Sequence, residues 1–342
     1  MKLIFFFVLS LLIPLNHAIS QNPQFADVKP NGITQVFTSW PTAYAAAVNG
    51  DFIYLPGILI PDIMTVNKKL FIFGSGLHPD SCSASGRTKV DILKILGGAG
   101  GGTIEGIQVN QATYLGSTES GYTTKLQNYT LKRCSLGGVV FNSLPDSLPE
   151  FITISESLVS SVSGAGNPVA LNCYFYKNII FTNIFHLGYC TFKNNIFANG
   201  DWVMGDINYT LFENNIFLYP SPFIPSLPNC FNTFLNNLKV GVANLNSCES
   251  TQQGTILVPS VDDIFILYNP SNSTYINNYH LLPGCPGIGA GTDGTDVGIY
   301  GTNNPTPVGW IPSNPHIYFK QVDAETGADG KLHIKVGVRT NN

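Results

Sequence analysis

A short repeated motif constrains the fold of this chain more than any other feature of the sequence. Residues 192–197 (FKNNIF) and residues 212–217 (FENNIF) differ at one position and begin 20 residues apart. Related motifs occupy residues 175–180 (FYKNII) and residues 234–238 (FLNNL). Each copy alternates apolar and polar residues, passes through Asn and ends in a second apolar pair. This pattern predicts two short β-strands joined by a sharp turn.

Weaker copies extend the repeat toward the N-terminus. They occupy residues 104–109, 131–136 and 154–159, and successive copies begin between 17 and 27 residues apart. Such spacings suit a coil with constant strands and variable loops, and one coil cannot bury its apolar face without neighbours. The signature of leucine-rich repeats is missing, and the Asn, Gly and β-branched content excludes helical repeats. The sequence therefore predicts an all-β fold, a right-handed parallel β-helix, which is a solenoid.

The repeat also predicts which residues stack. The Asn at one turn position of each copy is expected to lie at one corner of the solenoid, where stacked amides can hydrogen-bond from coil to coil and a left-handed backbone is tolerated. A Phe of each copy is expected to join an inner column. The four Asn residues are Asn178, Asn195, Asn215 and Asn237, and the four Phe residues are Phe175, Phe192, Phe212 and Phe234.

Two further pairs follow from the same register. Cys173 and Cys190 have inward parity, and we expect buried thiols rather than a disulfide because in-register strands hold Cβ atoms about 4.8 Å apart. Lys193 and Glu213 are equivalent outward positions and are expected to form an exposed ion pair of little energy. The total of seven Cys is odd, so at least one thiol is free or pairs between chains.

The two ends of the chain differ from the repeat. Residues 1–20 combine Lys2, an apolar run and small residues before Gln21, which is typical of a cleaved signal peptide; an N-terminal membrane anchor is the alternative. Residues 21–304 are assigned to the β-helix. Its first coil is expected to be capped by a helix at about residues 39–50, and a Gly-rich segment is expected to close its far end. Residues 305–342 are interpreted as a Pro-rich linker and a β-hairpin.

Composition excludes some classes of partner. Charged residues are 11% of the chain, against about 25% in typical domains, and the net charge is −4 with no basic cluster. Nucleic acid is therefore not an expected partner. No Cys or His spacing indicates a zinc site, and no cofactor is expected. No later segment is apolar enough to span a membrane once the signal peptide is cleaved.

These features together resemble a known family. The opening helix with its following strand, the Asn-Asn-Ile-Phe coils, and the closing residues 291–296 (GTDGTD) with their Pro-rich tail resemble the bacterial exported right-handed parallel β-helix proteins related to the pectate-lyase-like superfamily. The resemblance covers nearly the whole mature chain. It implies the fold and an exported location, secreted or at the cell surface. It implies no single activity, because this fold hosts lyases, hydrolases, esterases, epimerases and adhesins.

The best candidate for a site lies between two of the regular coils. Asp201 and Asp206 could supply the two carboxylates that a glycoside hydrolase needs, and Trp202 could stack on a sugar ring. The competing and favoured interpretation is an ordinary turn. The loops of residues 143–150 and 220–230 could form a groove. His186, alone in an apolar coil, is interpreted as structural.

Other acidic residues are less suggestive. Asp293 and Asp296 could bind Ca²⁺, but turn-stabilising hydrogen bonds explain them better, and no metal site is assigned. Residues 136–253 contain ten charged residues and no Arg, which is poor equipment for binding an anionic polysaccharide.

The sequence thus favours a non-catalytic exported protein that binds a glycan or another surface through Asp201, Trp202 and Asp206. A polysaccharide lyase or glycoside hydrolase is the first alternative, and a structural surface protein is the second. The ligand and the oligomeric state are left open.

Overall fold

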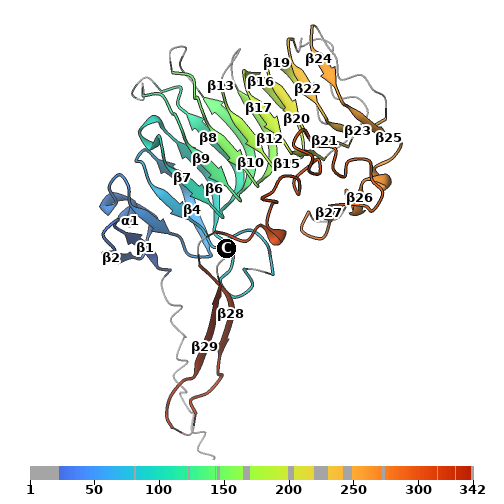
Figure 1. Ribbon diagram of the computed structural model, residues 1–342. Coiled ribbons are helices and arrows are strands. Elements are labelled where there is room, and N and C mark those ends of the chain that lie inside the picture. Colours follow the sequence, from blue (N-terminus) through green and yellow to red (C-terminus); the bar gives the residue numbers. More distant parts are fainter. Residues whose placement is uncertain are drawn as a thin grey trace, which may run out of the picture.

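The chain forms a right-handed parallel β-helix, as the repeat predicts (Figure 1). The structure is a computed structural model. It describes residues 23–80, 82–119, 121, 124–142, 144, 147–164, 170–198, 204–218, 230–241, 249–271, 274–313, 315–327 and 329–339.

One long sheet runs the length of the solenoid. Its twelve strands are parallel beyond the first two, and each is hydrogen-bonded to the equivalent strand of the next coil. In spatial order they are β2 (Thr34–Phe37), β1 (Phe25–Val28), β3 (Phe52–Tyr54), β5 (Phe71–Phe73), β7 (Thr103–Glu105), β9 (Thr130–Lys132), β11 (Thr153–Ser155), β14 (Tyr174–Tyr176), β17 (Thr191–Lys193), β20 (Leu211–Glu213), β22 (Thr233–Leu235) and β24 (Thr251–Gln253).

A second sheet of thirteen strands follows the sharp turn of each coil. Its main path contains β4 (Leu59–Val66), β6 (Lys89–Ile95), β8 (Gln108–Gly116), β10 (Ser135–Asn142), β12 (Leu158–Gly164), β15 (Ile179–Ile180), β18 (Ile196–Phe197), β21 (Ile216–Phe217), β23 (Leu238–Val240) and β25 (Ile256–Val258). A branch from β12 contains β13 (Ala170–Leu171), β16 (Ile184–Gly188) and β19 (Met204–Asn208).

The Asn ladder predicted from the repeat is present at the turn between the two sheets. The Asn195 amide nitrogen Nδ2 donates to Asn215 Oδ1 at 3.0 Å and to the Phe175 carbonyl at 2.9 Å. Its Oδ1 accepts from both the backbone and the side-chain nitrogen of Asn178. Asn215 bonds to Asn237 in the same way. All four side chains are fully buried, so the coil-to-coil bonds replace those that water would make.

The left-handed residue of the turn is the one before the ladder Asn. Its φ lies between 48° and 56° in the coils that carry a side chain there, because one residue must reverse the chain within two positions. These residues, here called the bend column, are Arg133, Glu156, Lys177, Asn194, Asn214 and Asn236. Gly106 and Gly254 continue the column at either end.

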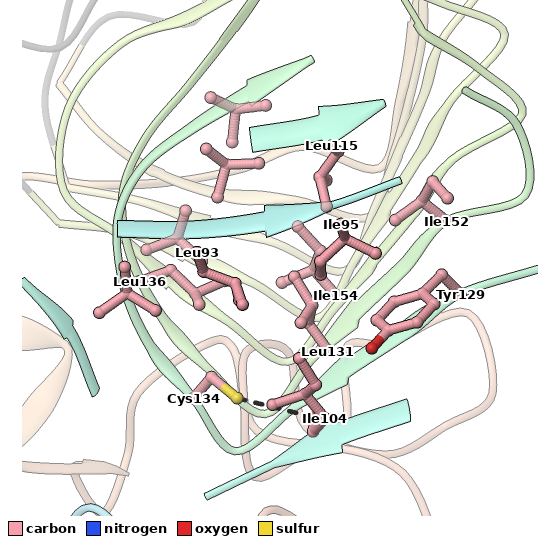
Figure 2. Packing of buried hydrophobic residues seen from close by; sticks show 14 of the residues in the cluster. Leu93, Ile95, Ile104, Leu115, Tyr129, Leu131, Cys134, Leu136, Ile152 and Ile154 are labelled. Atoms are coloured by element: carbon pink, nitrogen blue, oxygen red, sulfur yellow. Dashed lines mark hydrogen bonds between the residues drawn. The ribbon is translucent and has the colours of Figure 1, made fainter. Parts of the chain in front are cut away.

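The inner Phe column is also confirmed. Phe175 and Phe192 have ring centroids 4.3 Å apart, and the next two steps, to Phe212 and Phe234, are 5.1 and 4.8 Å. The rings are nearly parallel, and all four are buried. Earlier coils fill the same space with aliphatic residues such as Leu131 and Ile154, with the Tyr129 ring beside them (Figure 2).

The predicted cysteine and ion pairs are likewise found. Cys173 and Cys190 are buried free thiols, as expected. Lys193 Nζ lies 3.1 Å from Glu213 Oε1. That pair is partly covered rather than exposed, because the Thr292 hydroxyl from the C-terminal part of the chain also bonds to Glu213.

The start of the solenoid is capped by more than the predicted helix. Helix α1 (Trp40–Ala46) begins at its cap Ser39 but ends before the predicted residue 50. It stops there because Ala47 is extended and Lys68 Nζ binds the Tyr44 and Ala47 carbonyls at 2.7 and 2.8 Å. The sequence interpretation missed strands β1 and β2, which add to β3 in antiparallel fashion and protect the first edge of the sheet.

The sequence predicted that the Gly-rich C-terminal segment closes the far end of the solenoid. The segment instead lies along the side of the solenoid. Residues 285–313, here called the strap, run back along the side of the solenoid toward its first coils (Figure 1). They form hydrogen bonds with five members of the bend column. The contacts join Asn236 to Ala290, Asn214 to Thr292, Asn194 to Gly298, Lys177 to Asn304, and Arg133 to Ile311.

The end of the strap is held by a buried charged cluster. Arg133 donates from Nε to Glu156 Oε2 at 2.6 Å and from Nη1 to the Ile311 carbonyl at 2.7 Å, and its Nη1 lies 3.4 Å from Glu105. Glu105 accepts from the backbone and the hydroxyl of Ser313. Glu105, Arg133 and Glu156 are all buried, so each charge depends on the others.

Two small antiparallel pairs complete the chain. Strands β26 (Phe265–Leu267) and β27 (Asn278–Leu281) pair beside the last coils, and β28 (His316–Val322) and β29 (Ile334–Arg339) form the predicted terminal hairpin. Short 3₁₀ turns occupy Gly97–Ala99, Val261–Asp263 and Val308–Trp310. In the described part of the chain, no helix has the length and hydropathy needed to cross a membrane.

The ladder can be tested at its centre. Replacing Asn195 by Leu should remove the acceptor for Asn178 and the donor for the Phe175 carbonyl, at a cost of about 2–4 kcal/mol in the free energy of unfolding. Denaturant unfolding would measure the loss. Asn303, which is exposed, is the control, and Asn303→Ala should change stability by less than about 0.5 kcal/mol. If both variants have the same free energy of unfolding, the Asn ladder does not contribute to stability.

The charged cluster beneath the strap gives a second test. Arg133→Met should leave two buried carboxylates without the cation they share and destabilise the protein by about 3–5 kcal/mol. Lys132 is its neighbour in the chain, but its side chain is only half-buried and its Nζ lies as far as 4.0 Å from Glu156 Oε1, so Lys132→Met should cost less than about 1 kcal/mol. Faster proteolysis within residues 285–313 in Arg133→Met alone would report release of the strap. If Lys132→Met costs as much as Arg133→Met, the cluster does not hold the strap.

Because buried thiols resist losing their protons, they make the free energy of unfolding depend on pH in the alkaline range. Burial raises the pKa of the Cys134 thiol to about 12, whereas an unfolded thiol titrates near about 8.5. The folded state therefore holds this proton, and its contribution to stability is complete below about pH 8.5 and is lost as the pH rises toward 12. Unfolding free energies measured from pH 8 to 10 should fall less steeply in Cys134→Ala than in the wild type. Parallel curves would be inconsistent with a buried neutral thiol.

Candidate functional site

Asp206 is the one predicted site residue that lies within the described part of the chain. It belongs to β19, and register places it opposite His186 of β16 on the neighbouring coil. Its Oδ2 lies 2.8 Å from His186 Nδ1, and its Oδ1 accepts from Asn208 Nδ2 at 3.1 Å. Asp206 is buried, whereas the His186 side chain is 31% exposed. Both carboxylate oxygens are therefore occupied, and the group presented to solvent is the imidazole.

The backbone at this pair departs from regular strand geometry. His186 and Asp206 have φ values of 61° and 55°, in the left-handed region that side chains rarely adopt. Residues held there cost free energy and persist where the surrounding structure fixes them, often at functional positions. Here the parallel pairing of β16 with β19 holds both residues in place. The consequence is a histidine whose ring is oriented by a carboxylate on the next coil.

This pair can orient a proton or a hydrogen bond. With Nδ1–H donating to Asp206, the outer nitrogen Nε2 is left as an acceptor for a hydroxyl group. The same arrangement could serve a general base. Glycoside hydrolysis, however, requires two carboxylates placed on either side of the bond to be broken. Asp206 alone is present among the described residues of this coil, and its oxygens are turned to His186 and Asn208.

The other two predicted residues are not placed. Asp201 and Trp202 lie outside the described residues, so their distance from Asp206 stays a prediction. Of the two loops that were expected to form a groove, residues 219–229 and parts of residues 143–146 also lie outside. Cys230, at the end of the first loop, is disulfide-bonded.

The sequence interpretation did not foresee the pairing of His186 with Asp206. His186 was judged structural because it stands alone in an apolar coil. The signal that could have found its partner is the spacing: His186 and Asp206 are 20 residues apart, the same interval that separates the two best copies of the repeat. Residues separated by one repeat lie side by side in a solenoid.

A second column beside this pair was also missed. Tyr189, Tyr209 and Phe231 follow one another at 20 and 22 residues, as the copies of the repeat do, have positive φ and remain 42–56% exposed. Their rings stack with centroids 4.8 and 4.9 Å apart and nearly parallel planes. Because each ring covers the face of its neighbour, only edges and the two end faces are open to solvent. The column is therefore a ridge beside the His186–Asp206 pair rather than an open stacking platform for a sugar.

A separate groove lies on the outer face of the early coils. It has a volume of about 350 Å³ and is lined by outward residues of β4, β6, β8 and β10, among them Lys94, Tyr114 and Asn142, with Glu119 at its rim. No feature of the sequence indicated this groove, because these coils lack the Asn-Asn-Ile-Phe motif.

The acidic turns behave as ordinary turns. Asp293 accepts hydrogen bonds from the backbone and hydroxyl of Thr295, and these bonds lower the pKa of its carboxyl group. Asp296 accepts from the Gly289 backbone at 2.9 Å. Within the described ranges, no group of three or more His, Cys, Asp or Glu residues is arranged to hold a metal ion.

Comparison with family models, with curated proteins and with solved structures gives no match to this chain. The assignment of function therefore depends on the geometry described above.

Proposed function

We propose that this protein is an exported, non-catalytic glycan-binding β-helix, secreted or held at the cell surface, which binds its ligand beside the His186–Asp206 pair. The observation that carries the proposal is the imidazole oriented by a buried carboxylate and left with one nitrogen free for a hydroxyl. Trp202, close in sequence, would supply the aromatic surface, and Asp201 a further acceptor. The aromatic ridge of Tyr189, Tyr209 and Phe231 would border the ligand.

A neutral sugar fits this region better than a uronate. No Arg occurs between residues 136 and 253, so a carboxylate on the ligand would meet no bidentate partner there. Export is supported by the apolar N-terminal run and by the disulfide at Cys230, since disulfides persist in oxidising compartments. The resemblance to exported β-helix proteins of the pectate-lyase-like superfamily supports the same location.

One observation favours the enzyme alternative: a histidine oriented by an aspartate, as His186 is by Asp206, can act as a general base. The non-catalytic interpretation is preferred because glycoside hydrolysis needs two available carboxylates, and both oxygens of Asp206 are already engaged. A structural surface protein remains the third candidate. Incubation with a panel of polysaccharides, with and without Ca²⁺, separates binding from turnover: released reducing ends or unsaturated products would replace the binding proposal by the enzyme alternative.

Binding is tested by affinity electrophoresis of the whole mature protein in neutral polysaccharides. His186→Ala, Asp206→Asn and Trp202→Ala should each weaken retardation at least about tenfold, since a lost oriented hydrogen bond or ring contact is worth about 1.4 kcal/mol or more. His333→Ala is a matched control, because His333 also pairs with an aspartate, Asp329, but lies on the terminal hairpin.

The control should bind as the wild type does. If His186→Ala and Trp202→Ala are folded, by circular dichroism and melting temperature, and still bind normally, the ligand does not occupy this region. Retardation that disappears in His333→Ala as well would move the site to the hairpin.

A further inference from the structure

A second cavity shares no lining residue with the His186–Asp206 pair. It has a volume of about 340 Å³, within the range of small-molecule sites. Its floor is the outer face of the second sheet in the early coils, and its roof is the segment that precedes β27. The lining residues are Arg87, Gln108, Ser135, Leu136, Leu158, Ser160, Phe181, Thr274 and Tyr275.

The position of the cavity follows from a change in one outward column. Gln108, Ser135, Leu158 and Ile179 are equivalent residues on successive strands of the second sheet. From Leu158 onward the column is apolar and packs in a cluster with strap residues such as Val297. The polar members, Gln108 and Ser135, precede that cluster and line the cavity instead. The chain thus covers the apolar part of the column and leaves its polar part beneath a hollow.

Arg87 gives the cavity its charge. Its side chain is half-buried, and among the lining residues it alone carries a charge. No carboxylate of the described chain lies within ion-pair distance of it. Arg133 shows the contrast, since two glutamates neutralise it. The Arg87 guanidinium lies 5.9 Å from the Tyr275 ring centroid. A planar guanidinium without a carboxylate partner, in a chain with three Arg residues, is suited to a bidentate carboxylate ligand.

Hydrogen bonds through Asn110 and Asp91 determine which way the Gln108 side-chain amide is turned. The Asp91 carboxylate can only accept, so Asn110 Nδ2 donates to it at 2.8 Å. Asn110 Oδ1 then accepts from Gln108 Nε2 at 3.0 Å. This relay leaves Gln108 Oε1 buried and without a donor in the described chain. A ligand hydroxyl in the adjoining cavity is the group that would supply one, because an unpaired buried acceptor costs free energy.

Tyr275 forms a rigid wall. Its ring meets Trp310 of the strap edge to face, with centroids 6.2 Å apart, and meets His78 in the same way at 5.5 Å. Burial raises the pKa of its hydroxyl, while Arg87 and a hydrogen bond to Ser135 oppose that rise. Three separate segments therefore hold this ring over the sheet. The hydroxyls of Ser135, Ser160 and Thr274 line the same space.

We propose that this cavity binds a small hydroxylated carboxylate, with the carboxylate on Arg87, a hydroxyl on Gln108 Oε1 and the carbon chain against Tyr275 and Leu158. This activity goes beyond the glycan binding proposed above and uses none of its residues. The two ideas can fail independently.

Four probes separate the parts of this recognition by isothermal titration calorimetry on the whole mature protein. Gluconate carries both the carboxylate and the hydroxyls, glucitol carries the hydroxyls alone, acetate the carboxylate alone, and sulfate is an anion without either. Gluconate should bind saturably, and each other probe should bind at least about tenfold more weakly, since each lacks one set of paired contacts. Failure of gluconate to bind, or equal binding of glucitol or sulfate, overturns the proposal.

Variants assign the binding to this cavity. Arg87→Gln should lower gluconate affinity by at least about tenfold, whereas Lys89→Gln, which removes a cation two positions away that does not line the cavity, should leave it unchanged. Gln108→Ala and Ser160→Ala provide further variants should Arg87→Gln not fold, and Gln108→Ala should selectively reduce the preference for gluconate over acetate. Wild-type affinity in folded Arg87→Gln or in both of the other variants would overturn the assignment.

Discussion

The hydrogen bonds between stacked asparagine amides set the geometry on which the rest of this solenoid depends. Each amide is buried, so it must find a donor and an acceptor within the protein, and the coils on either side supply them at 2.8–3.1 Å. A slip of one residue between coils would break every such bond and turn each strand's side chains to the opposite face. The ladder therefore determines the register, and the Phe column inside the coils follows from it. Ser157 extends the ladder by one coil, where it replaces the amide with a hydroxyl.

The turn that carries the ladder also builds the binding surface for the strap. One residue before each ladder Asn must be left-handed, and its side chain points away from the core. These positions change along the solenoid from charged residues, Arg133, Glu156 and Lys177, to Asn194, Asn214 and Asn236. The charged ones are buried by the strap, and the Asn ones pair with its backbone. A single local requirement, the sharp bend, thus provides a row of polar groups along which about thirty residues of irregular chain are bound.

Residues 175–238 could be predicted closely from the sequence because their contacts repeat. The strands, the ladder, the Phe column and the free thiols of Cys173 and Cys190 all follow from the interval between copies. The path of residues 285–313 and the strands β1 and β2 could not be predicted, since each makes contacts that occur once in the chain and leave no periodic signal. Helix α1 was found from its cap Ser39, but its end depends on Lys68, whose side chain reaches across from another segment. Asp206 was nominated as a site residue while its partner His186 was set aside, although the 20 residues between them equal the interval of the repeat.

Both candidate sites lie where the repeat is interrupted. In a solenoid, a residue with equivalents on both neighbouring coils has its hydrogen bonds and its packing supplied by them, so nothing is left for a ligand. His186 faces Asp206 of the next coil, in a strand pair whose backbone leaves the regular conformation. Arg87 stands outside the coils, and Gln108 belongs to a column whose later members are apolar and covered. Polar groups that the repeat does not satisfy, and that the strap does not reach, are the ones left to bind other molecules. Binding is therefore expected at the irregular positions, and the two candidate sites differ in their chemistry: one presents an oriented imidazole and the other an unneutralised guanidinium.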